Sequence, residues 1–224
     1  SGVEGLISIG DRCIIKARTG RHVTCEVVGF RNNNARVLPF GTLEGIGLGA
    51  KVEICNQRPA IYPSFSWLGR VVNGLGEPLD GKGPLLNGNQ PYALQNSPPP
   101  AHYRERIGEK IDLGVRVMNT FLTVCKGQRL GIFSGSGVGK SILLSMMARH
   151  TNADVNEIGL IGERGREAKE FIEDVLGEEG LKRSVGVLAT SDEPPLVRRQ
   201  AAFLTMTLSE YFRNERKDVL CLMD

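Results

Sequence analysis

Hydrophobic and polar residues follow different patterns in the two halves of the chain. In residues 6–61, apolar and polar positions alternate along short segments that turn residues separate, which is typical of half-buried β-strands. The expected strands cover residues 13–17, 22–28, 35–38 and 51–55. Short strands joined by such turns predict a small antiparallel β-barrel or sandwich, and Tyr62-Pro63 marks its expected end.

Strands and helices alternate in the second half, after a connector rich in glycine and proline, residues 74–110. The expected strands are 128–133, 155–161, 184–189 and 218–223, and the expected helices are 140–150, 166–176 and 196–212. This order predicts a mostly parallel sheet covered on both faces. We therefore expect a β-barrel domain, residues 1–63, and part of an α/β domain, residues 64–224.

Composition narrows the class of protein. With 224 residues, 41% hydrophobic and 24% charged, the chain is an ordinary globular protein rather than a disordered one, and a net charge of +3 is too small to indicate nucleic-acid binding. Five dispersed cysteines predict neither disulfides nor a zinc site and favour a reducing compartment. No apolar run approaches the ~20 residues that span a bilayer. The missing initial Met and the final strand-like run are interpreted as cuts in a longer protein.

A glycine-rich segment, Ser134-Gly135-Ser136-Gly137-Val138-Gly139-Lys140-Ser141, joins an expected strand to an expected helix. Glycines there let backbone N–H groups converge on phosphate oxygens. Lys140 would reach the β- and γ-phosphates, and the Ser141 hydroxyl would bind Mg²⁺. Ser134 replaces the first glycine of the strict G-x-x-x-x-G-K-[ST] pattern. The residues expected to bind the nucleotide are Gly135, Ser136, Gly137, Val138, Gly139, Lys140, Ser141 and Ile142.

Charged residues follow two of the expected strands. Glu163 and Arg164 come after strand 155–161, and Asp224 comes after strand 218–223. Ligands of open α/β sheets bind beyond the carboxyl ends of the strands. Glu163 is therefore the candidate base that activates water, Arg164 a partner of phosphate, and Asp224 a ligand of Mg²⁺.

A polar segment precedes the helix expected at 196–212. Ser191 or Asp192 is expected to cap that helix, because their side-chain oxygens accept hydrogen bonds from the first free N–H groups.

These motifs stand in an order that resembles a known family. The segments are LGRVVNGLGEPLDGKGPL, a triple proline, SGSGVGKS, GERGRE, SDEPP and VLCLMD. The chain resembles the catalytic subunits of rotary ATP synthases and, within that family, the flagellar protein-export ATPases of the type III secretion branch. The segments GVRVMNTFL and LATSDEPPLVRRQAA are among the most similar.

The resemblance implies a RecA-like P-loop domain behind the β-barrel, with ATP and Mg²⁺ as its ligands. It implies that Glu163, Lys140 and Arg164 are catalytic, with Arg164 in contact with the phosphate region, and that Ser141 and Asp224 hold the metal. The chain would end at the acidic residue of the Walker B motif, so an arginine finger, the adenine-contacting loop and a helical C-terminal domain would be missing. A fragment of this kind is expected to hydrolyse ATP poorly, since an arginine finger supplies ~10³–10⁵ of the rate.

The resemblance also implies partners and a location. The intact protein would be a homohexamer that couples ATP hydrolysis to the unfolding and export of flagellar subunits. A regulator, a stalk-like protein, gate proteins, chaperones and export substrates would bind it, and nucleic acid would not. It would be cytoplasmic, with only peripheral contact to the inner membrane at the export apparatus.

Three alternatives stay open. The ATPase of a virulence-type secretion system shares the P-loop, GERGRE and DEPP segments, although Met118–Leu122 favours the flagellar branch. The second alternative is a subunit of an ATP synthase. A noncatalytic subunit would carry Gln at the position of Glu163, so this alternative is limited to a catalytic subunit. An RNA translocase would stack single strands on aromatic residues, and the N-terminal half offers Phe30 and Phe40 without a dense basic face.

Overall fold

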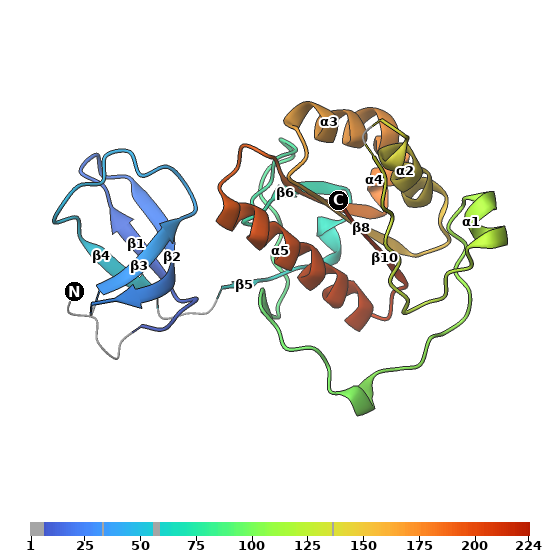
Figure 1. The fold of residues 1–224 in the computed structure, drawn as a ribbon, viewed down its shortest axis with the longest axis horizontal. Helices are drawn as coiled ribbons and strands as arrows, with labels where there is room; N and C mark the ends of the chain where they lie inside the picture. Colours follow the sequence, from blue (N-terminus) through green and yellow to red (C-terminus); the bar gives the residue numbers. More distant parts are fainter. Residues whose placement is uncertain (1–6, 33, 56–58, 136) are drawn as a thin grey trace.

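The computed structural model describes residues 7–32, 34–55, 59–135 and 137–224. A small N-terminal β-sheet lies beside a larger layered α/β structure (Figure 1). Among the helices of these ranges, none is both long enough and apolar enough to cross a membrane.

The N-terminal sheet has four antiparallel strands in the order β3-β2-β1-β4. They are β1 (Arg12–Lys16), β2 (His22–Arg31), β3 (Asn34–Pro39) and β4 (Val52–Cys55). Alternate side chains point inward, so that Cys13, Ile15, Val23 and Cys25 form its core. An irregularity in register between Val27 and Gly29 bends β2, and the sheet curls on itself in Figure 1. The antiparallel β-structure expected for this half is confirmed.

A parallel sheet organises the second half. Its strands are β6 (Arg70–Asn73), β8 (Val155–Ile161), β9 (Ser184–Ala189) and β10 (Val219–Met223), in the order β10-β8-β9-β6. Every pair in this sheet is parallel. β8 and β9 have the bounds expected from the sequence. Parallel strands place their carboxyl ends at one edge, which is where the candidate residues follow them.

Helices cover both faces of the parallel sheet. The long helix α5 (Pro195–Asn214) packs on one face, where Leu204 and Leu208 join Val155 and Val185 in one core. The other face carries α2 (Lys140–His150), α3 (Gly165–Glu170) and α4 (Gly177–Lys182). A π-helical stretch, Phe171–Leu176, continues α3 into α4, so the helix expected at 166–176 extends further than predicted.

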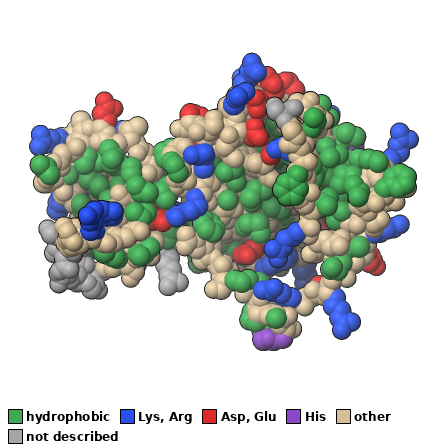
Figure 2. Space-filling model, viewed as in Figure 1, with side chains coloured by type: hydrophobic (Ala, Val, Ile, Leu, Met, Phe, Trp, Pro, Cys, Tyr) green, Lys and Arg blue, Asp and Glu red, His purple; other side chains and the backbone are tan. Residues whose placement is uncertain are grey.

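The remaining elements are short. They are β5 (Ala60–Ile61) paired with β7 (Tyr92–Ala93), 3-10 helices at Phe65–Trp67 and Ala101–Tyr103, and α1 (Arg116–Phe121). Hydrophobic side chains gather at the surface around α1 in Figure 2, where Val117, Phe121 and Leu122 are all exposed.

Two expectations are wrong. Residues 128–133 form no strand: Leu130 is half-exposed, Phe133 is almost fully exposed, and the segment pairs with no strand among the described residues. A strand needs hydrogen-bonded and packed neighbours, and an apolar pattern does not supply them. Neither Ser191 nor Asp192 caps α5, because the helix begins at Pro195 with Pro194 as N-cap. Proline has no N–H group that needs a cap, and the Asp192 carboxylate bonds Thr190 instead.

Candidate active site

The glycine-rich segment lies at the N-terminus of α2. Gly137 and Gly139 adopt φ angles of +75° and +98°, a region that side chains disfavour. A Cβ added at Gly135, Gly137 or Gly139 would meet no heavy atom within 4 Å, so the loop has open space beside it. The free N–H groups of the first turn of α2 carry partial positive charge, which favours an anion at this point. Ser136, a predicted binding residue, lies outside the described residues.

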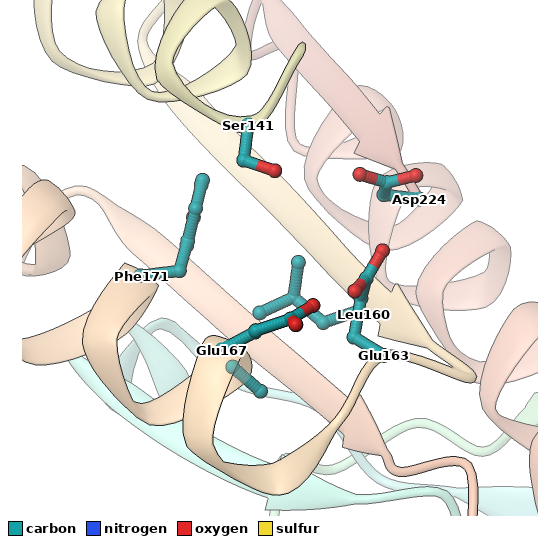
Figure 3. Close-up of a pocket in the computed structure, with 7 residues that line it drawn as sticks. Ser141, Leu160, Glu163, Glu167, Phe171 and Asp224 are labelled. Atoms are coloured by element: carbon teal, nitrogen blue, oxygen red, sulfur yellow. The ribbon is translucent and has the colours of Figure 1, made fainter. Parts of the chain in front are cut away.

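A small pocket opens next to this helix end. It is lined by Ser141, Leu160, Glu163, Glu167, Ala168, Phe171 and Asp224. Figure 3 shows the hydroxyl of Ser141 and the carboxylates of Glu163, Glu167 and Asp224 directed toward the same space. These side chains come from α2, the end of β8, α3 and the end of β10, so the parallel topology brings them together.

Backbone hydrogen bonds fix the two acidic residues that follow the strands. Asp224 donates its N–H to Gly159 O at 2.9 Å and accepts from Ile161 N at 2.6 Å, which continues the pairing of β10 with β8. Glu163 O accepts from Ser191 N at 2.9 Å, so the β9–α5 loop holds the turn that carries Glu163. The sheet therefore fixes the backbone of Asp224, and the loop after β9 fixes the backbone of Glu163.

The charges of the pocket are coupled. Lys140 Nζ donates to the Asp224 carboxylate in an ion pair. That hydrogen bond is the main cause of a raised pKa at Lys140, to which the charges of Asp224 and Glu163 also contribute. Burial, a hydrogen bond with Glu167 and the charge of Asp224 together raise the pKa of Glu163, against the lowering effect of Lys140. A carboxylate with a raised pKa binds a proton more readily and is a better general base.

The other predicted residues lie outside the pocket. The Arg164 side chain is 80% exposed and bonds the pocket residue Glu167, whose Oε1 accepts from Arg164 Nη1 at 3.3 Å. The side chains of Val138 and Ile142 are exposed, so these residues would contact a ligand through their backbone.

Glu167 is a site residue that the sequence analysis missed. It lines the pocket and is hydrogen-bonded to Glu163. Its position in the first turn of the helix that follows Glu163, at the same edge of the sheet, is the signal that could have identified it.

The donor set of the pocket suits Mg²⁺ bound together with phosphate. Ser141 and Asp224 offer oxygen atoms, which Mg²⁺ prefers. Within the described part of the chain, no cluster of three or more His, Cys, Asp or Glu residues could hold a metal by itself. Because Mg²⁺ usually takes one or two protein oxygens and completes its shell with phosphates and water, this arrangement fits a metal that arrives with a nucleotide.

Comparisons with known proteins agree with this geometry. Residues 114–224 match the family model of the ATP synthase alpha/beta family, nucleotide-binding domain. Flagellum-specific ATP synthases of Caulobacter vibrioides and Bacillus subtilis are 55% and 47% identical to this chain, each over 97% of it. The alignments cover 49% and 50% of those proteins, so the chain spans about half the length of the curated relatives it matches.

Two solved structures of a type III secretion ATPase are also similar to this chain. The assembled ATPase EscN of the enteropathogenic E. coli type III secretion system superposes with a TM-score of 0.87 at 36% identity. That match covers 97% of this chain and 52% of EscN. EscN in complex with its central stalk EscO matches with a TM-score of 0.86, also at 36% identity, over 97% of this chain and 53% of EscN. The expected α/β nucleotide-binding fold behind an antiparallel β-structure is confirmed, and residues 114–224 are similar to the nucleotide-binding domain of the ATP synthase alpha/beta family.

Proposed function

We propose that the protein is an ATPase that drives the unfolding and export of flagellar subunits through a type III secretion apparatus. The observation that carries this proposal is the convergence of Lys140, Ser141, Glu163 and Asp224 at one helix N-terminus. The flagellar branch is favoured because identity to flagellum-specific ATP synthases reaches 55%, against 36–42% to solved type III secretion ATPases of pathogenic bacteria. The ATPase of a virulence-type system is the second candidate, supported by the EscN superposition.

In the proposed reaction, the backbone of Gly135–Ser141 binds the triphosphate and Lys140 contacts its terminal phosphates. Ser141 and Asp224 would hold Mg²⁺, which when bound neutralises charge on the phosphate oxygens. Glu163 orients a water molecule and accepts its proton. Glu167 supports Glu163 and links it to Arg164, which faces solvent where a phosphate or a neighbouring subunit would approach.

The proposed assembly is a ring of identical subunits, a homohexamer, that contacts a stalk-like protein. The solved EscN structures support both points, since one is of an assembled ATPase and another includes its central stalk EscO. Regulator, gate, chaperone and substrate proteins, and a cytoplasmic location with peripheral contact to the inner membrane, belong to the same proposal. The division into residues 1–63 and 64–224 is supported by the separate core of the N-terminal sheet.

Nucleic-acid binding has little support from the N-terminal sheet. Phe40 is buried in the core on the α5 side and cannot stack on a base, which leaves Phe30 as a half-exposed aromatic.

The proposal is tested by measuring ATP binding and ATP turnover in parallel on the purified full-length protein, with Glu163→Gln beside wild type. We expect the variant to bind MgATP with unchanged affinity and to lose turnover by about 10²–10⁴-fold, the usual contribution of a general base. Glu170→Gln is the matched control, because Glu170 lies at the end of α3, the helix that follows Glu163, pairs with Arg166 and is absent from the pocket lining. Equal turnover in both variants would remove Glu163 from the mechanism.

A further inference from the structure

Glu157 is a buried acid that the proposed reaction does not use. It lies in β8 between β9 and β10, with Val185 and Cys221 as its register partners. Its exposed fraction is 0%, and within the described residues neither carboxylate oxygen has a hydrogen-bond partner. An acid in the interior strand of a sheet, with no donor to either oxygen, is an exception to the rule that buried polar groups are paired.

The side chains around Glu157 leave it without a partner. Glu157 and Gly159 point to the same face of β8, the face that packs against α5. A Cβ added at Gly159 would lie 2.7 Å from Thr205 Oγ1. One helical turn further along α5 is Ser209. Both hydroxyls donate to carbonyls of their own helix, Thr205 to Ala201 O and Ser209 to Thr205 O, each at 2.9 Å. They therefore have no proton left for Glu157.

Among the residues that the structure describes, no charged group compensates the Glu157 carboxyl group. The thiol of Cys221 faces Glu157 from β10. Burial raises the pKa of that thiol, a hydrogen bond with Ser209 lowers it, and the charge of Glu157 raises it. From β9 the neighbour is the apolar Val185. Burial alone raises the pKa of Glu157 well above its ordinary value, with no charged group of α5, β9 or β10 among its causes. An ionised carboxylate at this point would be an unpaired charge in an apolar interior, which strongly disfavours the charged form.

We propose that Glu157 is held as a neutral acid in the folded protein and acts as a pH-sensitive switch, whose ionisation loosens the packing of α5 on β8 and β10. These two strands lead directly into Glu163 and Asp224, so the loosened region is the one that positions the candidate site.

The sign of the effect follows from proton binding. The unfolded chain releases the Glu157 proton near its ordinary value of about 4.3, whereas the folded chain keeps it to a higher pH. Below that ordinary value Glu157 is protonated in both states, and its full contribution to the stability of the folded protein is present. As pH rises between the unfolded and the folded pKa, the unfolding equilibrium constant increases by about tenfold per pH unit, and it levels off once Glu157 ionises in the folded state.

The test compares urea unfolding of the wild-type protein and Glu157→Gln at intervals between about pH 5 and 8. The glutamine variant cannot ionise, so the ratio of the two unfolding constants isolates Glu157 and cancels every other titrating group, Glu163 included. We expect that ratio to rise with pH by up to about tenfold per unit. Glu157→Val serves the same comparison if the glutamine variant does not fold.

Two local measurements accompany the unfolding curves. Infrared spectroscopy of the folded wild type should show a protonated-carboxyl band at about pH 6 that Glu157→Gln lacks. Hydrogen exchange in peptides from β8 and β10 should accelerate with pH beyond the intrinsic rate, while peptides from β2 should not. A constant ratio of unfolding constants across the range, or a wild-type spectrum without the band, overturns the proposal.

Discussion

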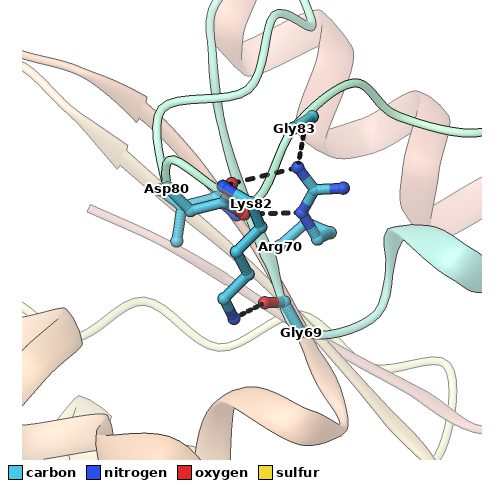
Figure 4. Close-up of polar contacts among 6 residues, drawn as sticks. Gly69, Arg70, Asp80, Lys82 and Gly83 are labelled. Carbon is cyan, nitrogen blue, oxygen red and sulfur yellow. Dashed lines mark hydrogen bonds and ion pairs between the residues drawn. The ribbon is translucent and has the colours of Figure 1, made fainter.

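Arg70 and Asp80 form a buried ion pair at the edge of the parallel sheet (Figure 4). Arg70 donates to both Asp80 oxygens, from Nε at 2.7 Å and Nη2 at 3.0 Å, and Asp80 also accepts from the backbone of Val71 and Lys82. Burial would raise the pKa of Asp80, but the hydrogen bonds from Arg70 and the backbone lower it well below its ordinary value. The pair ties the loop after β6 to the strand itself.

We expect Asp80→Asn to lower the free energy of unfolding by about 3–5 kcal/mol at neutral pH, because it leaves the Arg70 guanidinium buried without its charge partner. The wild-type contribution is present above the ordinary pKa of about 4 and is lost as pH falls below it, since the folded pKa is depressed. Urea unfolding at neutral and at acidic pH measures both effects. Asp218→Asn is the control, since its pair with Lys126 is half-exposed and contributes little. Equal losses in the two variants would contradict this account.

Motif spacing was sufficient to predict which residues meet at one edge of the sheet, but it did not predict which charged residues are buried. The P-loop, Glu163 and Asp224 were predicted because strand ends and helix starts place such residues together wherever the sheet is parallel. The unpartnered burial of Glu157 was not, because a strand residue's neighbours come from distant segments. The Arg70–Asp80 pair was missed because spacing within a Gly- and Pro-rich loop does not show that the loop folds back onto the strand before it.

Whole elements were predictable where they are packed. β8, β9 and α2 have the expected bounds, and each is anchored by buried apolar side chains, among them Ile158 and Leu160 of β8, Val185 and Val187 of β9, and Leu144 and Met147 of α2. Residues 128–133 also contain apolar positions, but apart from the partly buried Ile132 they are exposed. Lys126 is held to Asp218 before them and Lys140 to Asp224 after them. Pattern alone cannot distinguish a segment that joins a sheet from one that runs beside it.

The contact between β6 and α5 depends on a glycine. A Cβ added at Gly74 would lie 2.6 Å from Val197 O and 3.2 Å from Ala201 Cβ, so the helix backbone would have to move. We expect Gly74→Ala to cost about 1–3 kcal/mol of stability, the usual penalty for overpacking. In Gly41→Ala the added methyl group meets nothing within 4 Å, and stability should stay near wild type. Thermal or urea unfolding of both variants decides the point, and a Gly74→Ala protein as stable as Gly41→Ala would refute the close approach.

The N-terminal sheet is joined to the α/β part through α5. Phe40 enters the core on the α5 side, and the buried carboxylate of Glu26 pairs with Arg199 in the second turn of that helix. α5 follows the loop in which Ser191 bonds the backbone of Glu163. The two parts of the molecule and the candidate site are therefore connected through one helix.

Arg199→Ala should destabilise the protein by about 1–3 kcal/mol, because it leaves the Glu26 carboxylate buried without its ion-pair partner. The double variant with Glu26→Gln should lose less than the sum of the two single variants. Arg213→Ala is the control, since Arg213 is exposed at the end of α5 and its side chain bonds only Asn214 among the described residues. Additive losses would show that Glu26 and Arg199 are not coupled.

The most direct measurement is ATP turnover per subunit of the full-length protein against protein concentration, for wild type and Glu163→Gln. If one pocket hydrolyses ATP in an assembly of copies, specific activity rises with concentration as subunits associate, and the Glu163→Gln protein binds ATP but stays about 10²–10⁴-fold slower throughout. Specific activity that is independent of concentration, together with a Glu163→Gln protein as active as wild type, would contradict both the assembly and the role of Glu163.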